Sequence, residues 1–292
     1  MAGESRLFCF GLGYSARVLA ARLMARGWHI AGTTRSAEKA AALEAAGIEA
    51  FLFGRDRPLD DPAAALARTT HLLSSVPPDD DGDPVTSRHG ADIADCSGLV
   101  WAGYLSTTGV YGDRGGGWVD EGSDLRPTGE RGRRRVTAER AWLDLHRQRG
   151  LPLHVFRLAG IYGPGRNALA GVRAGTAKRI DRPGQVFGRI HVADIAAVLE
   201  ASMARPNPGR IYNLCDDNPA PPAEVIEYAC KLLGVAAPPL IPFDRAELSA
   251  PGLSFYRDNK RVSNRRIKEE LGVELAYPDY KAGLKALLAA QA

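Results

Sequence analysis

The sequence has no apolar run that approaches the roughly 20 residues of a membrane-spanning helix, so we expect no membrane association. Its four cysteines are scattered without a Cys-x-x-Cys pair, which indicates reduced thiols in a cytoplasmic protein, with Cys9 and Cys215 in apolar runs of the core. The first residues contain neither a basic segment nor a long apolar one, so we expect no secretory signal. The net charge of +4 is small and no basic stripe recurs, which argues against nucleic acid as a partner.

What the sequence does contain is a regular alternation of short apolar runs and amphipathic segments. Its 292 residues, 45% of them hydrophobic and 25% charged, suffice for one large or two ordinary globular domains. The pattern predicts strands at 7–10, 29–34, 50–53, 71–76, 99–106 and 153–158, with helices at 15–27, 37–47, 62–68 and 131–150. This order predicts an α/β fold, a Rossmann-like doubly wound parallel sheet with helices on both faces.

The alternation weakens after about residue 165. We predict a Rossmann domain over residues 1–165, to which 190–217 returns with a helix at 192–205 and a strand at 211–215. Residues 166–189 and 218–292 form a smaller, mostly helical region that binds the substrate. Two segments, 77–84 and 112–130, are predicted to be loops, and the second is long and Gly-rich, as functional loops often are.

The first candidate site is the sequence GLGYSA, which follows the first strand and opens the first helix. Gly11 suits a tight turn, Gly13 allows the backbone to approach a pyrophosphate, and Ala16 allows close packing of helix on strand. Tyr14 and Ser15 bring the free N–H groups of the helix terminus to the phosphates. An ordinary Gly-rich turn is the alternative.

The end of the second strand bears on the choice of nicotinamide cofactor. An enzyme selective for NAD carries an acidic residue there, whereas this chain has Thr34, Arg35 and Ser36. A guanidinium beside small hydroxyls suits a 2′-phosphate, so we favour NADP, with NAD as the alternative. Arg35 could instead be a solvated residue at the start of a helix.

Hydroxyl side chains follow the strand at 99–106, at the sheet edge where ligands of open α/β sheets bind. Thr107, in the sequence STTGVYG, could hold a substrate oxygen. Four arginines then lie at 131–135, on the first turn of a helix, where the helix dipole disfavours cations. A cofactor phosphate, an anionic substrate or the acids at 120, 121 and 124 could compensate them.

Together these segments resemble the short-chain dehydrogenase/reductase superfamily, on its extended or atypical branch with the NAD-dependent epimerases and dehydratases. The resemblance rests on GLGYSA (11–16), STTGVYG (106–112), RLAGIYGPGR (157–166), RIHVADIA (189–196) and IYNLCDD (211–217). It implies hydride transfer at a nicotinamide, with Ser75, Val76 and Pro77 bordering the nicotinamide side. It also implies a catalytic Ser/Thr, which matches Thr107, and a Tyr-x-x-x-Lys pair.

The chain departs from that family at the Tyr-x-x-x-Lys pair. The Tyr position falls on Arg131 and the Lys position on Arg135. Arg135 could still hold the ribose, but Arg131 cannot act as an acid near pH 7, because a guanidinium has a pKa above about 12. Tyr111 or a water would have to supply the proton, although the tyrosine of Val-Tyr-Gly is usually structural in the family.

Two functions therefore stay open. The first, which we favour, is an NADP-dependent oxidoreductase or epimerase that acts on a small-molecule substrate, with an anionic one as a candidate. The second is a non-catalytic redox sensor or regulatory module that binds NADP. A monomer and a homodimer are both compatible with the sequence.

Overall fold

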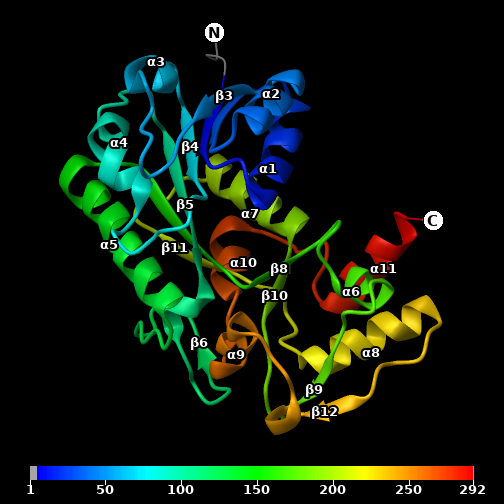
Figure 1. The fold of residues 1–292 in the computed structure, drawn as a ribbon. Coiled ribbons are helices and arrows are strands. Elements are labelled where there is room, and N and C mark those ends of the chain that lie inside the picture. Colours follow the sequence, from blue (N-terminus) through cyan, green and yellow to red (C-terminus); the bar gives the residue numbers. More distant parts are fainter. Residues whose placement is uncertain (1–4, 292) are drawn as a thin grey trace. The chain divides into compact units, whose positions relative to one another are not determined.

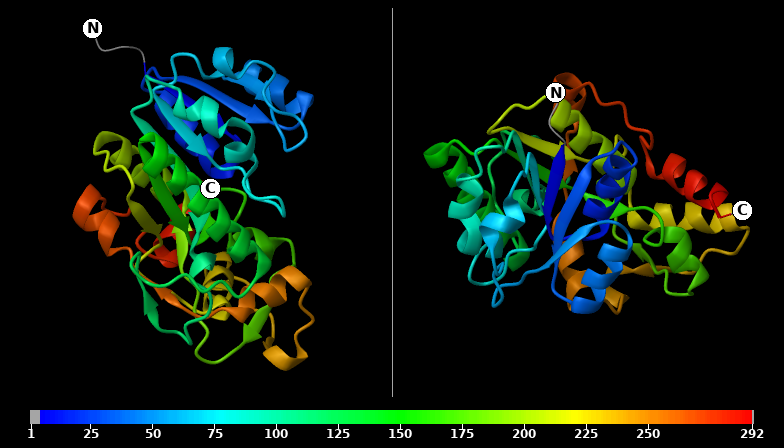
Figure 2. Two further views of the ribbon diagram at one scale, coloured as in Figure 1. Left: turned by 90° about the vertical axis from the view of Figure 1, so that its left-hand side faces the viewer. Right: turned by 90° about the horizontal axis from the view of Figure 1, so that it is seen from above.

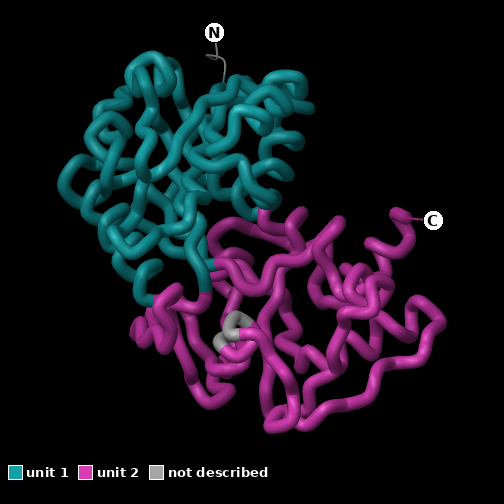
Figure 3. The backbone as a smooth tube through the Cα atoms, viewed as in Figure 1, with its two compact units in different colours: residues 1–107, 133–157, 196–212 teal, residues 108–132, 158–195, 213–292 magenta. Residues whose placement is uncertain are grey.

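The fold was analysed in a computed structural model, which describes residues 5–291 and all their side chains except those at 250, 251 and 254. The chain divides into two compact units (Figure 3). Unit 1 comprises residues 1–107, 133–157 and 196–212, and unit 2 comprises 108–132, 158–195 and 213–292. The loop at 112–130 thus groups with unit 2, whereas the sequence placed it in the Rossmann domain. No helix among residues 5–291 is long and apolar enough to cross a membrane.

A seven-stranded parallel sheet forms the centre of unit 1 and confirms the predicted fold class (Figure 1). The strand order is β11-β7-β5-β4-β1-β2-β3. The strands are β1 (Arg6–Phe10), β2 (His29–Thr34), β3 (Glu49–Leu52), β4 (His71–Ser74), β5 (Trp101–Thr107), β7 (Leu153–Leu158) and β11 (Ile211–Leu214), the last of which ends in unit 2. β1, β4 and β7 are buried along their whole length, as strands covered on both faces must be.

Helices cover both faces of this sheet (Figures 1 and 2). One face carries α1 (Tyr14–Met24), α2 (Ala37–Ala45) and α7 (Val192–Ala204), and Arg22 of α1 forms an ion pair with Glu200 of α7 at 2.8 Å. The other face carries α3 (Pro62–Leu66), α4 (Pro84–Ala94) and α5 (Glu130–Arg149). Apolar side chains of α3, α4 and α5 form one buried cluster with the phenyl rings of β1, which holds these helices on the sheet.

The sequence missed α4, because only the acidic loop before it was recognised. Asp83 caps this helix by accepting hydrogen bonds from the N–H groups of Val85 and Thr86, and Pro84 occupies its first turn. The Asp-Pro pair at 83–84 was therefore a readable start signal.

Unit 2 is built from short strand pairs and helices. The strands pair as β8 (Gly160–Tyr162) with β10 (Arg189–His191), β9 (Arg179–Asp181) with β12 (Leu240–Pro242), and β6 (Trp118–Val119) with β13 (Arg261–Val262). The helices are α6 (Ala168–Arg173), α8 (Pro222–Leu233), α9 (Ala250–Arg257), α10 (Arg265–Leu271) and α11 (Tyr280–Ala289), with 3-10 turns at Thr108–Tyr111 and Phe243–Arg245. The sequence missed every one of these short strands, because two or three residues carry no readable alternation.

Candidate functional site in unit 1

The Gly-rich turn after β1 is fixed by hydrogen bonds and close contacts with its neighbours in unit 1. Gly11 has φ +82°, a conformation that favours glycine, and its N–H donates to Thr33 Oγ1 at 2.8 Å. Ser75 Oγ, just beyond β4, donates to Gly11 O at 2.5 Å. A Cβ at Gly11 would lie 3.1 Å from Ser75 Oγ and 3.2 Å from Val76 Cγ2. The structure thus brings Ser75 and Val76 against the turn, and exposed Pro77 follows them.

The N-terminus of α1 opens directly from this turn. Gly13 is its N-cap and, because it lacks a side chain, supplies no side-chain capping hydrogen bond. Ser15 and Ala16 are buried against the sheet, and Tyr14 begins the helix. An uncapped helix terminus beside a glycine turn is suited to a pyrophosphate, which carries negative charge to the positive end of the helix dipole.

The residue that directly follows β2 is an arginine. Arg35 is exposed, and no residue of the described chain pairs with its guanidinium. Its Cγ lies 3.9 Å from the position that a Cβ on Gly54 would take, so the side chain extends past the end of β3. Ser36 caps α2 by accepting a hydrogen bond from Lys39 N, and Thr34 Oγ1 accepts one from Ser36 N at 3.5 Å. An uncompensated cation and two small hydroxyls therefore lie together at this strand end.

The carboxyl end of β5 carries the remaining unit 1 candidates. Thr107 is the last residue of the strand and is half-buried. Arg135 donates from Nη1 to Leu105 O and lies over the Tyr104 ring, 5.9 Å from its centroid. This contact fixes a guanidinium against β5. From the family resemblance, Arg135 is the residue that we expect to hold the ribose.

The other two catalytic candidates lie in unit 2. The Tyr111 hydroxyl is completely buried and donates to Asn213 Oδ1 at 2.7 Å, which favours a structural role. Arg131 is exposed in the first turn of α5. The next residue, Gly132, is buried within unit 2: a Cβ placed on it would lie 2.9 Å from Gly109 O.

The arginine cluster at 131–135 does not act as one group. Arg134 forms an ion pair with Asp80, and Arg135 binds the carbonyl of Leu105. Glu130 opens the helix and offsets part of the unfavourable dipole interaction. The acids proposed as partners bind elsewhere: Asp124 pairs with Arg126, Glu121 with Arg266, and Asp120 with the N–H of Gly122.

Sequence reasoning missed a buried polar network under β5. Glu139 of α5 is 1% exposed and pairs with Arg157 of β7 at 2.7 Å. Ser106 donates to the same carboxylate at 2.5 Å, so this hydroxyl is engaged and not open to a substrate. The signal was present, since position 139 lies on the same helical face as Val136 and Trp142. A carboxylate on an apolar face predicts a buried partner.

A second buried acid lies beside this network. Burial raises the pKa of Asp83, while hydrogen bonds from the backbone N–H groups of Thr86 and Val85 and the charge of Arg135 act in the opposite direction. Burial also raises the pKa of Tyr104, whose ring lies under Arg135. Burial thus acts against the charged form of both groups, and Arg135 is the cation that they share.

No protein-family model matches the chain. Protein YeeZ of Escherichia coli K12 is 29% identical over 279 residues, which cover 92% of this chain and 95% of that protein. A solved structure of a functionally unknown conserved protein from Silicibacter pomeroyi is 52% identical, with a TM-score of 0.91, and the match covers 98% of this chain and 99% of that one.

Two further solved structures relate the fold to nicotinamide enzymes. A putative NAD-dependent epimerase/dehydratase from Methylobacillus flagellatus is 26% identical, with a TM-score of 0.70 and coverage of 99% and 98%. UDP-glucuronic acid 4-epimerase from Bacillus cereus, solved with NAD, is 15% identical, with a TM-score of 0.75 and coverage of 96% of both chains. The second likeness is one of fold alone. The chain therefore belongs to the same family as the Silicibacter pomeroyi protein, and its fold is that of the NAD-binding epimerases and dehydratases.

Proposed function

We propose that unit 1 binds NADP(H) and that the protein uses it as an oxidoreductase or epimerase on a small substrate. The observation that carries the proposal is the guanidinium of Arg35 at the end of β2, which pairs with no residue among 5–291 and belongs to the same unit as the turn at Gly11. The turn and the terminus of α1 suit the pyrophosphate, and Arg35 with Thr34 and Ser36 suits a 2′-phosphate. NAD would bind at the same turn, but it has no 2′-phosphate for Arg35 to contact.

The remaining unit 1 residues would position the rest of the cofactor and the substrate. Arg135, fixed by its bond to Leu105 O, would hold the nicotinamide ribose. Thr107 at the end of β5 would orient a substrate oxygen, and Ser75–Pro77 would border the nicotinamide. The bound nicotinamide would supply or accept a hydride.

The proton would come from water in this proposal. Arg131 holds its own proton too tightly to donate it near neutral pH. The hydroxyl of Tyr111 is already bound to Asn213 inside unit 2. We therefore expect slow turnover, because general acid catalysis by a side chain typically contributes about 10²–10⁴-fold.

Replacing Arg131 by tyrosine tests whether the site is built for the chemistry of the family. We expect Arg131→Tyr to raise the rate of NADPH oxidation with a panel of small carbonyl compounds, followed by nicotinamide absorbance. Arg131→Phe is the matched control, since it lacks the acidic hydroxyl and should leave the rate unchanged. An equal rise in both variants would show that loss of the arginine, and not gain of an acid, is responsible.

A second candidate is a redox sensor that binds NADP without turnover. The replacement of the family tyrosine by Arg131 favours it. A sensor must distinguish NADPH from NADP⁺, so it should bind them with affinities that differ at least about tenfold. Similar affinities together with measurable carbonyl reduction would favour the enzyme, and unequal affinities without turnover would favour the sensor.

A further inference from the structure

A cavity of about 210 Å³ is lined by residues of unit 2, none of which is assigned to the cofactor. Its walls come from α6, α8 and α11 together with β8 and β10, and they are mostly apolar, with Ala168, Val225 and Leu284 among them. Its volume is that of about seven water molecules and falls below the roughly 300 Å³ at which sites for drug-sized ligands begin. A ligand the size of a single substituted ring would fill it.

One wall of this cavity carries an arginine whose guanidinium is only partly engaged. Arg189 Nη1 donates to Phe187 O at 2.9 Å and Ala220 O at 3.0 Å. Within residues 5–291, its Nε and Nη2 have no hydrogen-bond partner and no carboxylate lies within 4.0 Å of it. Burial lowers the pKa of Arg189, as expected for a cation without a close counterion.

The nearest acid does not supply that counterion at neutral pH. Asp216 is 2% exposed and its Oδ1 faces Arg189 N at 3.5 Å. Burial raises the pKa of Asp216 to about 7, against the lowering effect of Arg189. Much of the Asp216 population is therefore neutral at pH 7, and the charge of Arg189 stays incompletely compensated.

A second donor faces the same cavity. The Tyr280 ring is 4% exposed, and its hydroxyl forms no hydrogen bond to another residue in the part of the chain that the structure describes. The Tyr162 hydroxyl, by contrast, donates to Asp279 O at 3.3 Å. It lies so close to α11 that a Cβ at Gly283 would come within 2.1 Å of it. The Tyr280 hydroxyl oxygen stays accessible, so it is free to donate to a ligand in the cavity.

We propose that this cavity binds a small monocarboxylate with an apolar body. Arg189 Nη2 and the Tyr280 hydroxyl would donate to the carboxylate, and Val225 and Leu284 would contact the apolar part. A phosphate dianion fits less well, because one cation in apolar surroundings compensates one charge only. Every residue in this site belongs to unit 2, and none of them is among the residues assigned to the cofactor.

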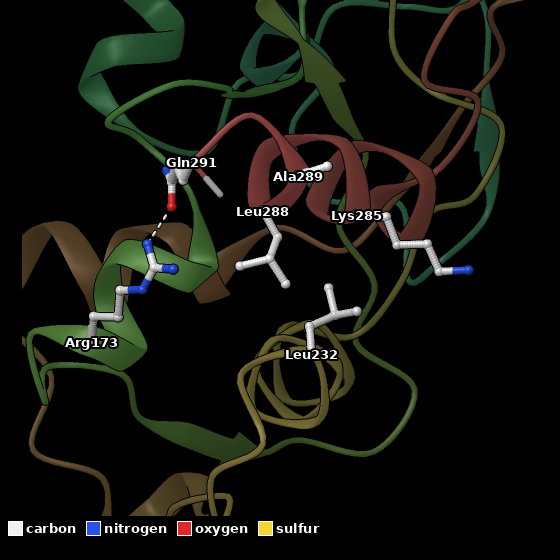
Figure 4. Close-up of a pocket in the computed structure, with 6 residues that line it drawn as sticks. All are labelled: Arg173, Leu232, Lys285, Leu288, Ala289 and Gln291. Atoms are coloured by element: carbon white, nitrogen blue, oxygen red, sulfur yellow. Dashed lines mark hydrogen bonds between the residues drawn. The ribbon is translucent and has the colours of Figure 1, made fainter.

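A second hollow in unit 2 also contains an arginine and serves as a control for the proposed carboxylate site. It has a volume of about 380 Å³ and is lined by residues near the C-terminal ends of α6, α8 and α11, where Leu232 and Leu288 point toward one another (Figure 4). Its arginine is exposed and already donates to Gln291. Cationic charge there is solvated and engaged, so we expect no ordered carboxylate in this hollow.

The test is a calorimetric titration of the full-length protein with benzoate, and with benzamide as the neutral analogue of the same shape. We expect benzoate to bind with a Kd of about 1 mM, as befits a ligand of this size, and benzamide to bind at least about tenfold more weakly. Tyr280→Phe keeps the ring and should weaken benzoate several-fold. Arg173→Gln should leave its affinity unchanged.

Replacing Arg189 would also leave two carbonyls without their donor and could disturb the fold. Two further measurements therefore test the proposal without changing this residue. Ala168→Leu fills the cavity without touching the polar groups and should abolish benzoate binding while the thermal transition is retained. Crystals grown with 4-bromobenzoate should show an anomalous bromine peak between Val225 and Leu284. Equal binding of benzamide, unchanged binding by Ala168→Leu, or absence of binding at about 10 mM benzoate would each overturn the proposal.

Discussion

Removing the Arg35 side chain should separate NADPH from NADH. Arg35 is exposed and unpaired among the described residues, so Arg35→Ala breaks no internal contact and should not destabilise the fold. A charge-assisted hydrogen bond contributes about 1.5–3 kcal/mol, and exposure to solvent places this one near the lower limit. We therefore expect a loss of about 1.4–2 kcal/mol for NADPH, which is a rise in Kd of about 10–30-fold.

Titration calorimetry at two salt concentrations measures this effect. The Kd for NADH should change less than about twofold, and the difference between the cofactors should shrink as salt screens the exposed pair. Arg149→Ala is the matched control: this arginine is also exposed and pairs with Asp95 at the far end of α5, so its loss should affect neither cofactor. Equal weakening of NADPH and NADH by Arg35→Ala, or no weakening at all, would refute the assignment of a 2′-phosphate to this strand end.

Three further perturbations follow from the structure. Gly11→Ala places a Cβ at φ +82° and within 3.2 Å of Val76 Cγ2, so it should abolish NADPH binding in calorimetry while the circular dichroism spectrum stays native. Retained NADPH affinity would contradict the assignment of this turn to the pyrophosphate. Glu139→Gln leaves Arg157 buried without a countercharge and should cost about 3 kcal/mol in urea unfolding, and a loss below about 1 kcal/mol would argue against a structural ion pair. Because burial raises the pKa of Asp216 to about 7, the folded state retains a proton that the unfolded state releases near pH 4. The free energy of unfolding should therefore fall between about pH 4 and 7 and then level off; Asp216→Asn should flatten that slope, and the same slope in the variant would rule out this residue as its source.

The sequence predicted the parts of this protein that depend on neighbours along the chain. Buried strands and the turn at Gly11 are local patterns, and the seven-stranded sheet follows from their order. The engagement of Ser106 was not predictable in that way, because its partner Glu139 lies 33 residues away and the third member, Arg157, another 18. Which polar groups neutralise one another is decided by tertiary packing.

Arg189 illustrates the same limit in unit 2. The sequence RIHV identified a recognisable segment, but it could not show that two carbonyls occupy one end of the guanidinium while the other faces a cavity. The same holds for the arginines at 131–135: the sequence suggested one anion-binding cluster, and the structure gives Arg134 and Arg135 separate partners.

The measurement that tests the account most directly is a calorimetric titration of the unmodified protein with NADPH and, separately, with NADH. The account predicts micromolar binding of NADPH and weaker binding of NADH, because only NADPH presents a phosphate to Arg35. Absence of binding by both cofactors would contradict the oxidoreductase and the sensor alike, and the open turn at Gly11 would then need another ligand.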